Sequence, residues 1–130
     1  MMTSTFTGLS AIRQIAIVVK DVERAVAFYR DALGARLLFQ APPGLAFFDA
    51  GGVRLMLSRA EKPEFDHPSS VLYFKVDGIE AAHRALSDRG VTFVGAPHLI
   101  ARMPDHELWM AFFRDSEGNT QALMEERRSP

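Results

Sequence analysis

The chain has 130 residues, of which 48% are hydrophobic, and this is enough apolar material for one domain with its own core. Its net charge of −1 argues against nucleic acid or an anionic membrane surface as the main partner, and no apolar run reaches the ~18 residues of a membrane-spanning helix. The lack of cysteine excludes disulfides, thiolate nucleophiles and cysteine-based metal sites. We therefore expect a cytoplasmic protein with neither a membrane nor a nucleic-acid partner.

The first half of the chain predicts a strand, a helix and three further strands. Residues 12–19 are rich in β-branched side chains, which is typical of a strand. Asp21 is a suitable helix N-cap, and apolar residues follow it at helical spacing as far as Leu33. Gly34 suits the left-handed position just past a helix end. The three strands are expected over 36–39, 45–49 and 53–58.

The second half repeats this order after a proline-containing linker, residues 59–70. Asp77 with Glu80 three residues later resembles a capping box, and Gly90 ends the predicted helix. The strands of this half are expected over 71–76, 91–94, 108–114 and 120–125.

An internal repeat links the two halves. Ala46-Phe47-Phe48 and Ala111-Phe112-Phe113 are each followed by an aspartate, a glycine and a strand-like segment. A repeat of this kind indicates one structural unit used twice. We predict a single domain over 1–130 with an α+β fold, built from a βαβββ module at 12–58 and a second one at 71–126.

The modules differ between their second and third strands. The first module has a short turn there, whereas the second has a long segment, residues 95–107, which we expect to be a packed loop. Long loops in compact domains are usually functional. This one carries a cluster of polar residues: His98, Arg102, Asp105, His106 and Glu107.

Several segments resemble the vicinal oxygen chelate superfamily, which includes glyoxalases, bleomycin-resistance proteins and extradiol dioxygenases. They are the strand and cap at 15–21, Ala27-Phe28-Tyr29, Leu33-Gly34, the strand at 52–57 and the turn at 113–119. The resemblance covers about 12–126. It implies two curved sheets that form an open, cleft-bearing mixed β-barrel.

The resemblance also implies four metal-ligand positions, which fall at Gln14, Leu55, Val71 and Ala122. Only Gln14 carries a side chain able to coordinate a metal ion. Shifting the other three positions by one residue does not restore an oxygen or imidazole site. We therefore expect no bound metal and no cofactor, and the sequence assigns no catalytic residue.

The candidate ligand-binding residues are Gln14, Leu55, Ala122, His98, Arg102, His106 and Trp109. Each has an ordinary structural alternative. Gln14 either binds a ligand or is a polar strand end. His98 and His106 either build a replacement metal site or are solvated. Arg102 either pairs with Asp105 or binds a carboxylate, and Trp109 is either a pocket wall or part of the core.

Two function classes follow from the resemblance. The first is a metal-independent homodimeric protein that sequesters a small apolar or aromatic molecule in the cleft between the modules. The second is an enzyme of the glyoxalase or dioxygenase type, with a noncanonical site around 95–107. The modules pair either within one chain or between the chains of a dimer.

Overall fold

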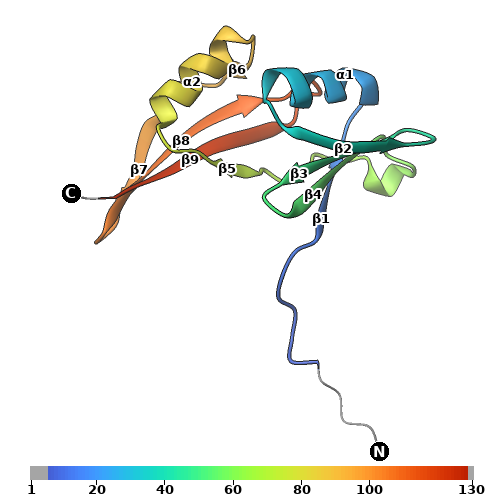
Figure 1. The fold of residues 1–130 in the computed structure, drawn as a ribbon, viewed down its shortest axis with the longest axis horizontal. Coiled ribbons are helices and arrows are strands. Elements are labelled where there is room, and N and C mark those ends of the chain that lie inside the picture. The colour runs from blue at the N-terminus through green and yellow to red at the C-terminus, as the bar shows by residue number, and fades with distance from the viewer. Residues whose placement is uncertain (1–5, 129–130) are drawn as a thin grey trace, which may run out of the picture.

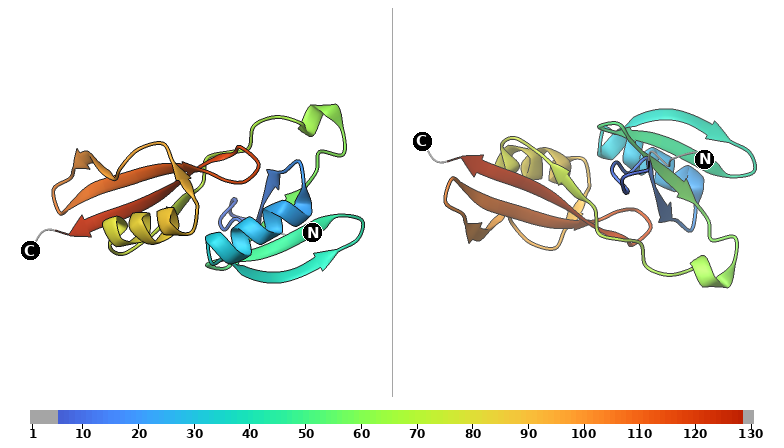
Figure 2. Two further views of the ribbon diagram at one scale, coloured as in Figure 1. Left: turned by 90° about the horizontal axis from the view of Figure 1, so that it is seen from above. Right: turned by 90° about the horizontal axis from the view of Figure 1, so that it is seen from below.

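Each half of the chain forms a mixed β-sheet with a helix on one side. The computed structural model describes residues 6–128, and its two α-helices lie on the same side of the two sheets (Figure 1). The two halves lie side by side, and the linker that connects them loops out at one end of the molecule (Figure 2). None of the helices in residues 6–128 has the length and hydrophobicity needed to cross a membrane.

The first half follows the predicted βαβββ order. Its elements are β1 (Gln14–Val18), α1 (Val22–Ala27), the π-helix η1 (Phe28–Ala32), β2 (Arg36–Ala41), β3 (Leu45–Ala50) and β4 (Val53–Ser58). The strands are arranged β1-β4-β3-β2, with β1 parallel to β4. Asp21 caps α1, since its carboxylate accepts the Arg24 N–H at 3.0 Å. Gly34 has a φ of +72°, as predicted.

The second half begins after the short 3-10 helix η2 (Pro63–Phe65) in the linker. Its elements are β5 (Tyr73–Lys75), α2 (Ile79–Asp88), β6 (Thr92–Phe93), β7 (His98–Arg102), β8 (His106–Arg114) and β9 (Thr120–Arg128). The strands are arranged β5-β9-β8-β6, and β7 also pairs with β8. The α+β prediction is confirmed, and the two sheets do not close into a barrel.

The segment 95–107 is not a loop, which corrects the sequence-based expectation. Residues 98–102 form β7, which pairs with β8 through a tight turn in which the Met103 N–H donates to the His106 carbonyl at 2.8 Å. The partner strands β8 and β9 also run further than predicted. Glu107 lies opposite Arg127, and opposite charges at such positions favour pairing.

The cap of α2 also differs from the prediction. The N-cap is Gly78, with a φ of +83°, and not Asp77. The carboxylate of Glu125 on β9 accepts the N–H groups of Gly78 at 2.6 Å and Ile79 at 3.2 Å. A carboxylate from another strand therefore satisfies the first N–H groups of this helix.

The hydrophobic core consists of two clusters, one beneath each helix. The first contains Val26 and Tyr29 of the α1–η1 segment, and the second contains Ile79 of α2. Phe28, Leu33 and Phe74 pack against both clusters. The two halves thus share apolar contacts on the helix side of the sheets.

Candidate functional site

We use the name open face for the side of each sheet that points away from α1 and α2. On the first sheet, the open face carries two stacked phenylalanine rings, Phe39 and Phe47, with centroids 4.6 Å apart and planes 27° apart. Phe39 is 48% exposed. The Arg54 guanidinium lies 5.8 Å from the centre of the Phe47 ring. An aromatic stack with a cation beside it is a surface suited to planar ligands.

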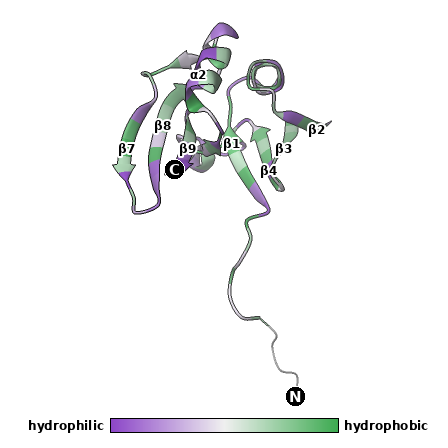
Figure 3. Ribbon diagram, turned by 60° about the vertical axis from the view of Figure 1, so that its left-hand side comes forward, coloured by the Kyte–Doolittle hydropathy of each residue, from purple (hydrophilic) through white to green (hydrophobic). Residues whose placement is uncertain are grey.

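Polar groups on this part of the open face are few. The Gln14 amide nitrogen lies 3.7 Å from the sulfur of Met56 on β4. The Nε atom of Arg54 is buried and has no hydrogen-bond partner in the described part of the chain. Figure 3 shows hydrophobic colouring along most of β1 and hydrophilic colouring near its start. Gln14 and Arg54 thus offer hydrogen-bond donors within a mainly apolar surface.

The open face of the second sheet is aromatic around a small residue. Ala122 on β9 lies opposite Tyr73 on β5 and opposite Phe112 on β8. The Tyr73 and Phe112 rings meet edge to face across it, with centroids 6.1 Å apart. Met110 lies opposite Met124 further along the same strands. The open faces of both sheets thus present aromatic rings and methionine side chains.

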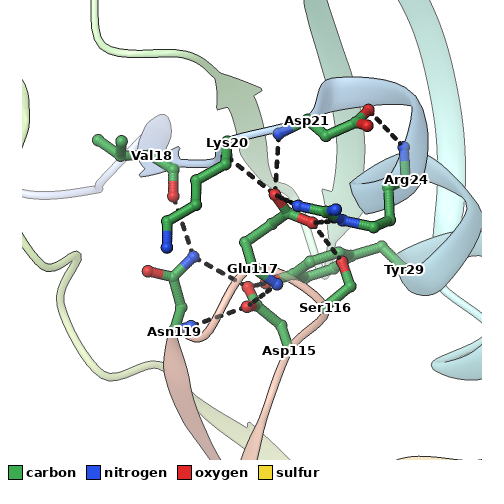
Figure 4. Close-up of polar contacts among 9 residues, drawn as sticks. All are labelled: Val18, Lys20, Asp21, Arg24, Tyr29, Asp115, Ser116, Glu117 and Asn119. Atoms are coloured by element: carbon green, nitrogen blue, oxygen red, sulfur yellow. Dashed lines mark hydrogen bonds and ion pairs between the residues drawn. The ribbon is translucent and has the colours of Figure 1, made fainter.

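A buried polar cluster joins the two halves at the turn between β8 and β9 (Figure 4). One Glu117 oxygen accepts the N–H groups of Lys20 at 2.9 Å and Asp21 at 2.8 Å. The Arg24 guanidinium pairs with the same carboxylate, at 2.7 Å between Nε and Oε2. The Arg24 hydrogen bonds, helped by the Asp21 N–H, lower the pKa of Glu117 to about 2. Glu117 is therefore ionised at neutral pH.

Asp115 forms the second half of this cluster. Its carboxylate accepts the Tyr29 hydroxyl at 2.7 Å and the N–H groups of Glu117 and Asn119 at 2.9 and 2.8 Å. Burial, followed by the charge of Asp115, raises the pKa of the Tyr29 hydroxyl far above its usual value. The Asn119 amide donates to the Val18 carbonyl at 3.0 Å. These bonds fix the position of the second sheet relative to β1 and α1.

Comparison with known proteins identifies the family. Residues 11–123 match the family described as the Glyoxalase/Bleomycin resistance protein/Dioxygenase superfamily. The chain belongs to this superfamily. The resemblance predicted from the sequence is therefore confirmed.

The proteins that this chain resembles carry different names. A glyoxylase-like domain-containing protein of Didymella fabae is 31% identical over 127 residues, covering 86% of this chain and 91% of that protein. The antibiotic binding protein TnmS3 of a Streptomyces species has a TM-score of 0.73 at 24% identity, covering 93% of this chain and 99% of that one. A lactoylglutathione lyase of Agrobacterium tumefaciens has a TM-score of 0.66 at 24% identity, covering 90% and 94%. At this identity the two solved structures establish the fold alone.

The superfamily positions inferred from the sequence are only partly on the open face. Gln14 and Ala122 lie there, but Leu55 belongs to the core beneath α1 and is 2% exposed. Successive residues of a strand point to opposite faces, so the β4 side chains on the open face are Arg54 and Met56. The expectation that Leu55 and Ala122 line one surface is therefore wrong.

The superfamily position that the sequence placed at Val71, on the second sheet, is also shifted. Tyr73, and not Val71, pairs with Ala122. Gln14 lies opposite Arg54 on the first sheet. Within residues 6–128, no group of three or more His, Asp or Glu side chains is placed so that it could hold a metal ion. Metal independence stays a prediction, which metal analysis of the protein can check.

The residues predicted from 95–107 lie on β7 and the adjoining end of β8. Arg102 pairs with Glu107 at 3.0 Å, and not with Asp105. The His106 Nδ1 lies 2.7 Å from Asp105, and its Nε2 lies 3.7 Å from Glu126. His98 is exposed, with its Nδ1 3.3 Å from the Ala96 carbonyl. His106 is six residues from Phe112 along β8, which is about 20 Å at the rise of a strand.

Trp109 lies on the helix side of the second sheet. It packs against the core beneath α2, its Nε1 donates to Glu107 at 3.1 Å, and the Arg127 guanidinium lies 4.7 Å from its ring. This corresponds to the core alternative considered for Trp109 from the sequence. The structure therefore does not bring Arg102 and Trp109 to the open face beside Gln14.

Sequence reasoning did not select Phe39, Phe47, Arg54 or Tyr73, all of which lie on the open faces. The repeat contained a signal for one of them. In each Ala-Phe-Phe segment the second phenylalanine is fully buried beneath a helix, as Phe48 and Phe113 show. Alternation along a strand then directs Phe47 and Phe112 to the open face.

Proposed function

We propose that this superfamily member binds a small aromatic or apolar molecule on its open faces and sequesters it without a metal ion. The observation that carries the proposal is the half-exposed Phe39 stacked on Phe47 beside Arg54. Covering exposed aromatic surface is favourable by ~25 cal/mol per Å². The antibiotic-binding relative gives a precedent for such a role on this fold.

Arg54 and Gln14 give the proposed site its polarity. Arg54 is partly exposed beside Phe47, so its charged guanidinium could donate a hydrogen bond to a ligand oxygen on this face. Gln14 supplies an amide at the edge of β1. We therefore expect the ligand to combine fused or linked aromatic rings with a carbonyl, phenol or ether oxygen.

The proposal includes a homodimer and a cytoplasmic location. Large apolar side chains are exposed in the single chain, among them Phe39 and Tyr73, which are both 48% exposed. A second copy that packs against part of this exposed apolar surface would bury it, and two-fold pairs are the commonest assemblies. Light scattering on the purified protein should give twice the mass of the chain, and a monomer at micromolar concentration would contradict the dimer.

Calorimetric titration with a set of two- and three-ring aromatic ketones and phenols tests the binding proposal. We expect at least one compound to bind with a micromolar Kd, and Phe39→Ala to weaken it about tenfold through loss of ring stacking. The matched control is Phe65→Ala, since Phe65 is 51% exposed but lies in the linker helix η2. Equal loss of affinity in both variants would contradict the proposal.

A second candidate function is an enzyme of the glyoxalase type, centred on His106. Its side chain is 18% exposed and lies between the carboxylates of Asp105 and Glu126. A histidine oriented by a carboxylate is a common general acid or base. A lactoylglutathione lyase assay, run with and without added Zn²⁺ or Ni²⁺, tests this candidate. Turnover that is lost in His106→Gln but kept in His98→Gln would favour it over sequestration.

A further inference from the structure

A cavity lies on the helix side of the sheets, opposite the proposed ligand site. This interhelix groove has a volume of about 400 Å³ and is bounded by the η1 end of the first helical segment and by α2. Its lining is mainly aliphatic and aromatic, and includes Leu33, Leu55, Phe74, Leu86, Phe113 and Leu123. Small-molecule sites commonly have volumes of about 300–1,000 Å³ with such linings.

Two cations, Arg89 and Lys75, belong to the residues that line the groove, and Arg89 is the one that reaches across it. Arg89, at the end of α2, donates to the Ala32 carbonyl at 3.3 Å and so reaches across to η1. Neither Arg89 nor Lys75 forms an ion pair within the described chain. Asp49 also lines the groove, and its carboxylate accepts the Gly52 N–H at 3.1 Å. The lining therefore carries a net positive charge.

We propose that the interhelix groove binds a medium-chain carboxylate. The alkyl chain would lie against Leu33, Phe74 and Leu86, which are partly exposed, and would replace water on their apolar surface. The carboxylate would lie at the mouth, where the fork of N–H donors on Arg89 matches its two oxygens. This site lies on the opposite side of the sheets from Phe39 and Arg54, so it is independent of the proposed sequestration.

The groove combines an apolar surface with a cationic side chain, and this combination favours an amphipathic ligand. A purely apolar ligand would leave Arg89 without an acidic partner, and a small inorganic anion would leave the leucine-lined interior unfilled. A chain with one terminal carboxylate satisfies both surfaces at once. Calorimetric titration with octanoate and with 1-octanol separates the contributions of the alkyl chain and of the carboxylate to the affinity, because the alcohol keeps the chain and lacks the charge.

Two pairs of variants locate the site. Ala85→Phe places a ring in the groove from α2, and its control is Ala81→Phe, an exposed position on the same helix outside the lining. Arg89→Gln removes the cation, and its control is the exposed Arg84→Gln. We expect octanoate affinity to fall about tenfold in Arg89→Gln, while 1-octanol affinity stays unchanged. Ala85→Phe should weaken both probes, and both controls should bind like the natural chain.

The variant Phe39→Ala tests whether octanoate binds at the interhelix groove or on the open face. If octanoate binds at the interhelix groove, its affinity is unchanged in Phe39→Ala. This holds even if the same variant binds aromatic ligands more weakly on the open face. Loss of octanoate binding in Phe39→Ala but not in Ala85→Phe would overturn the proposal. So would a lack of octanoate binding by the natural chain, or equal affinities for octanoate in Arg89→Gln and the natural chain.

Discussion

The Tyr29 hydroxyl donates a 2.7 Å hydrogen bond to the Asp115 carboxylate, although the two residues are 86 positions apart. Tyr29 is fully buried beneath the first sheet, and Asp115 begins the turn between the two long strands of the second. This bond therefore connects the two modules directly. The relative position of the open faces depends on it.

Replacing Tyr29 with phenylalanine tests this connection. The ring packing is kept, but Asp115 loses a donor while it stays buried at 6% exposure. Leaving a buried acceptor short of a partner costs about 1–3 kcal/mol. Urea denaturation should show a loss of this size in the free energy of unfolding of Tyr29→Phe. The half-exposed Tyr73→Phe serves as the control, and equal stability of the two variants would contradict the role of the bond.

Acid should weaken the module junction through Glu117. Its pKa is lowered from 4.5 to about 2 in the folded chain. A group whose folded pKa is lowered contributes stability above its unfolded pKa, and this contribution is lost as the pH falls from about 4.5 to about 2. We expect the free energy of unfolding to fall less steeply over this range in Glu117→Gln.

Glu64→Gln is the control for the acid experiment, because Glu64 is exposed in η2. Other carboxylates with lowered pKa values, such as Glu80 and Asp105, titrate alike in the natural chain and in both variants. The difference between the unfolding curves therefore isolates Glu117. Parallel curves for Glu117→Gln and the natural chain would show that this carboxylate is not linked to folding.

Replacing Arg54 should affect the stability of the protein and its ligand affinity differently. Its buried Nε has no partner, so Arg54→Leu removes an unsatisfied donor and should leave stability unchanged or increase it. The same change should weaken an aromatic ketone ligand about tenfold, since a hydrogen bond to a charged donor is lost. Thermal unfolding and calorimetry measure the two effects. Arg13→Leu, at an exposed position just before β1, should alter neither.

Metal content discriminates between the two candidate functions. We expect protein purified without chelators to contain well under one equivalent of Zn, Ni, Mn or Fe, since the open face pairs Gln14 with Arg54 and Ala122 with Tyr73. Elemental analysis gives the answer. A stoichiometric metal that disappears in His106→Ala would contradict the expectation and favour the enzyme.

Local features of the fold were predictable from the sequence. Asp21 caps its own helix because its acceptor and the Arg24 N–H are three residues apart. Gly34 adopts the left-handed conformation that its position requires. The Ala-Phe-Phe repeat and the strand alternation around it indicate two similar modules, because periodicity in a strand depends only on neighbouring residues.

Features that depend on distant partners were decided by the tertiary structure. Glu125 replaces Asp77 as the cap of α2 because β9 brings its carboxylate to the helix, 46 positions away from Ile79. Residues 98–102 become a strand because β8 offers a free edge. Leu55 faces the core and Arg54 the open face because Val26 and Tyr29 cover one side of the sheet. A shift of one residue in strand register reverses which side chains face the ligand, so the composition of the site depends on packing between elements that no local pattern specifies.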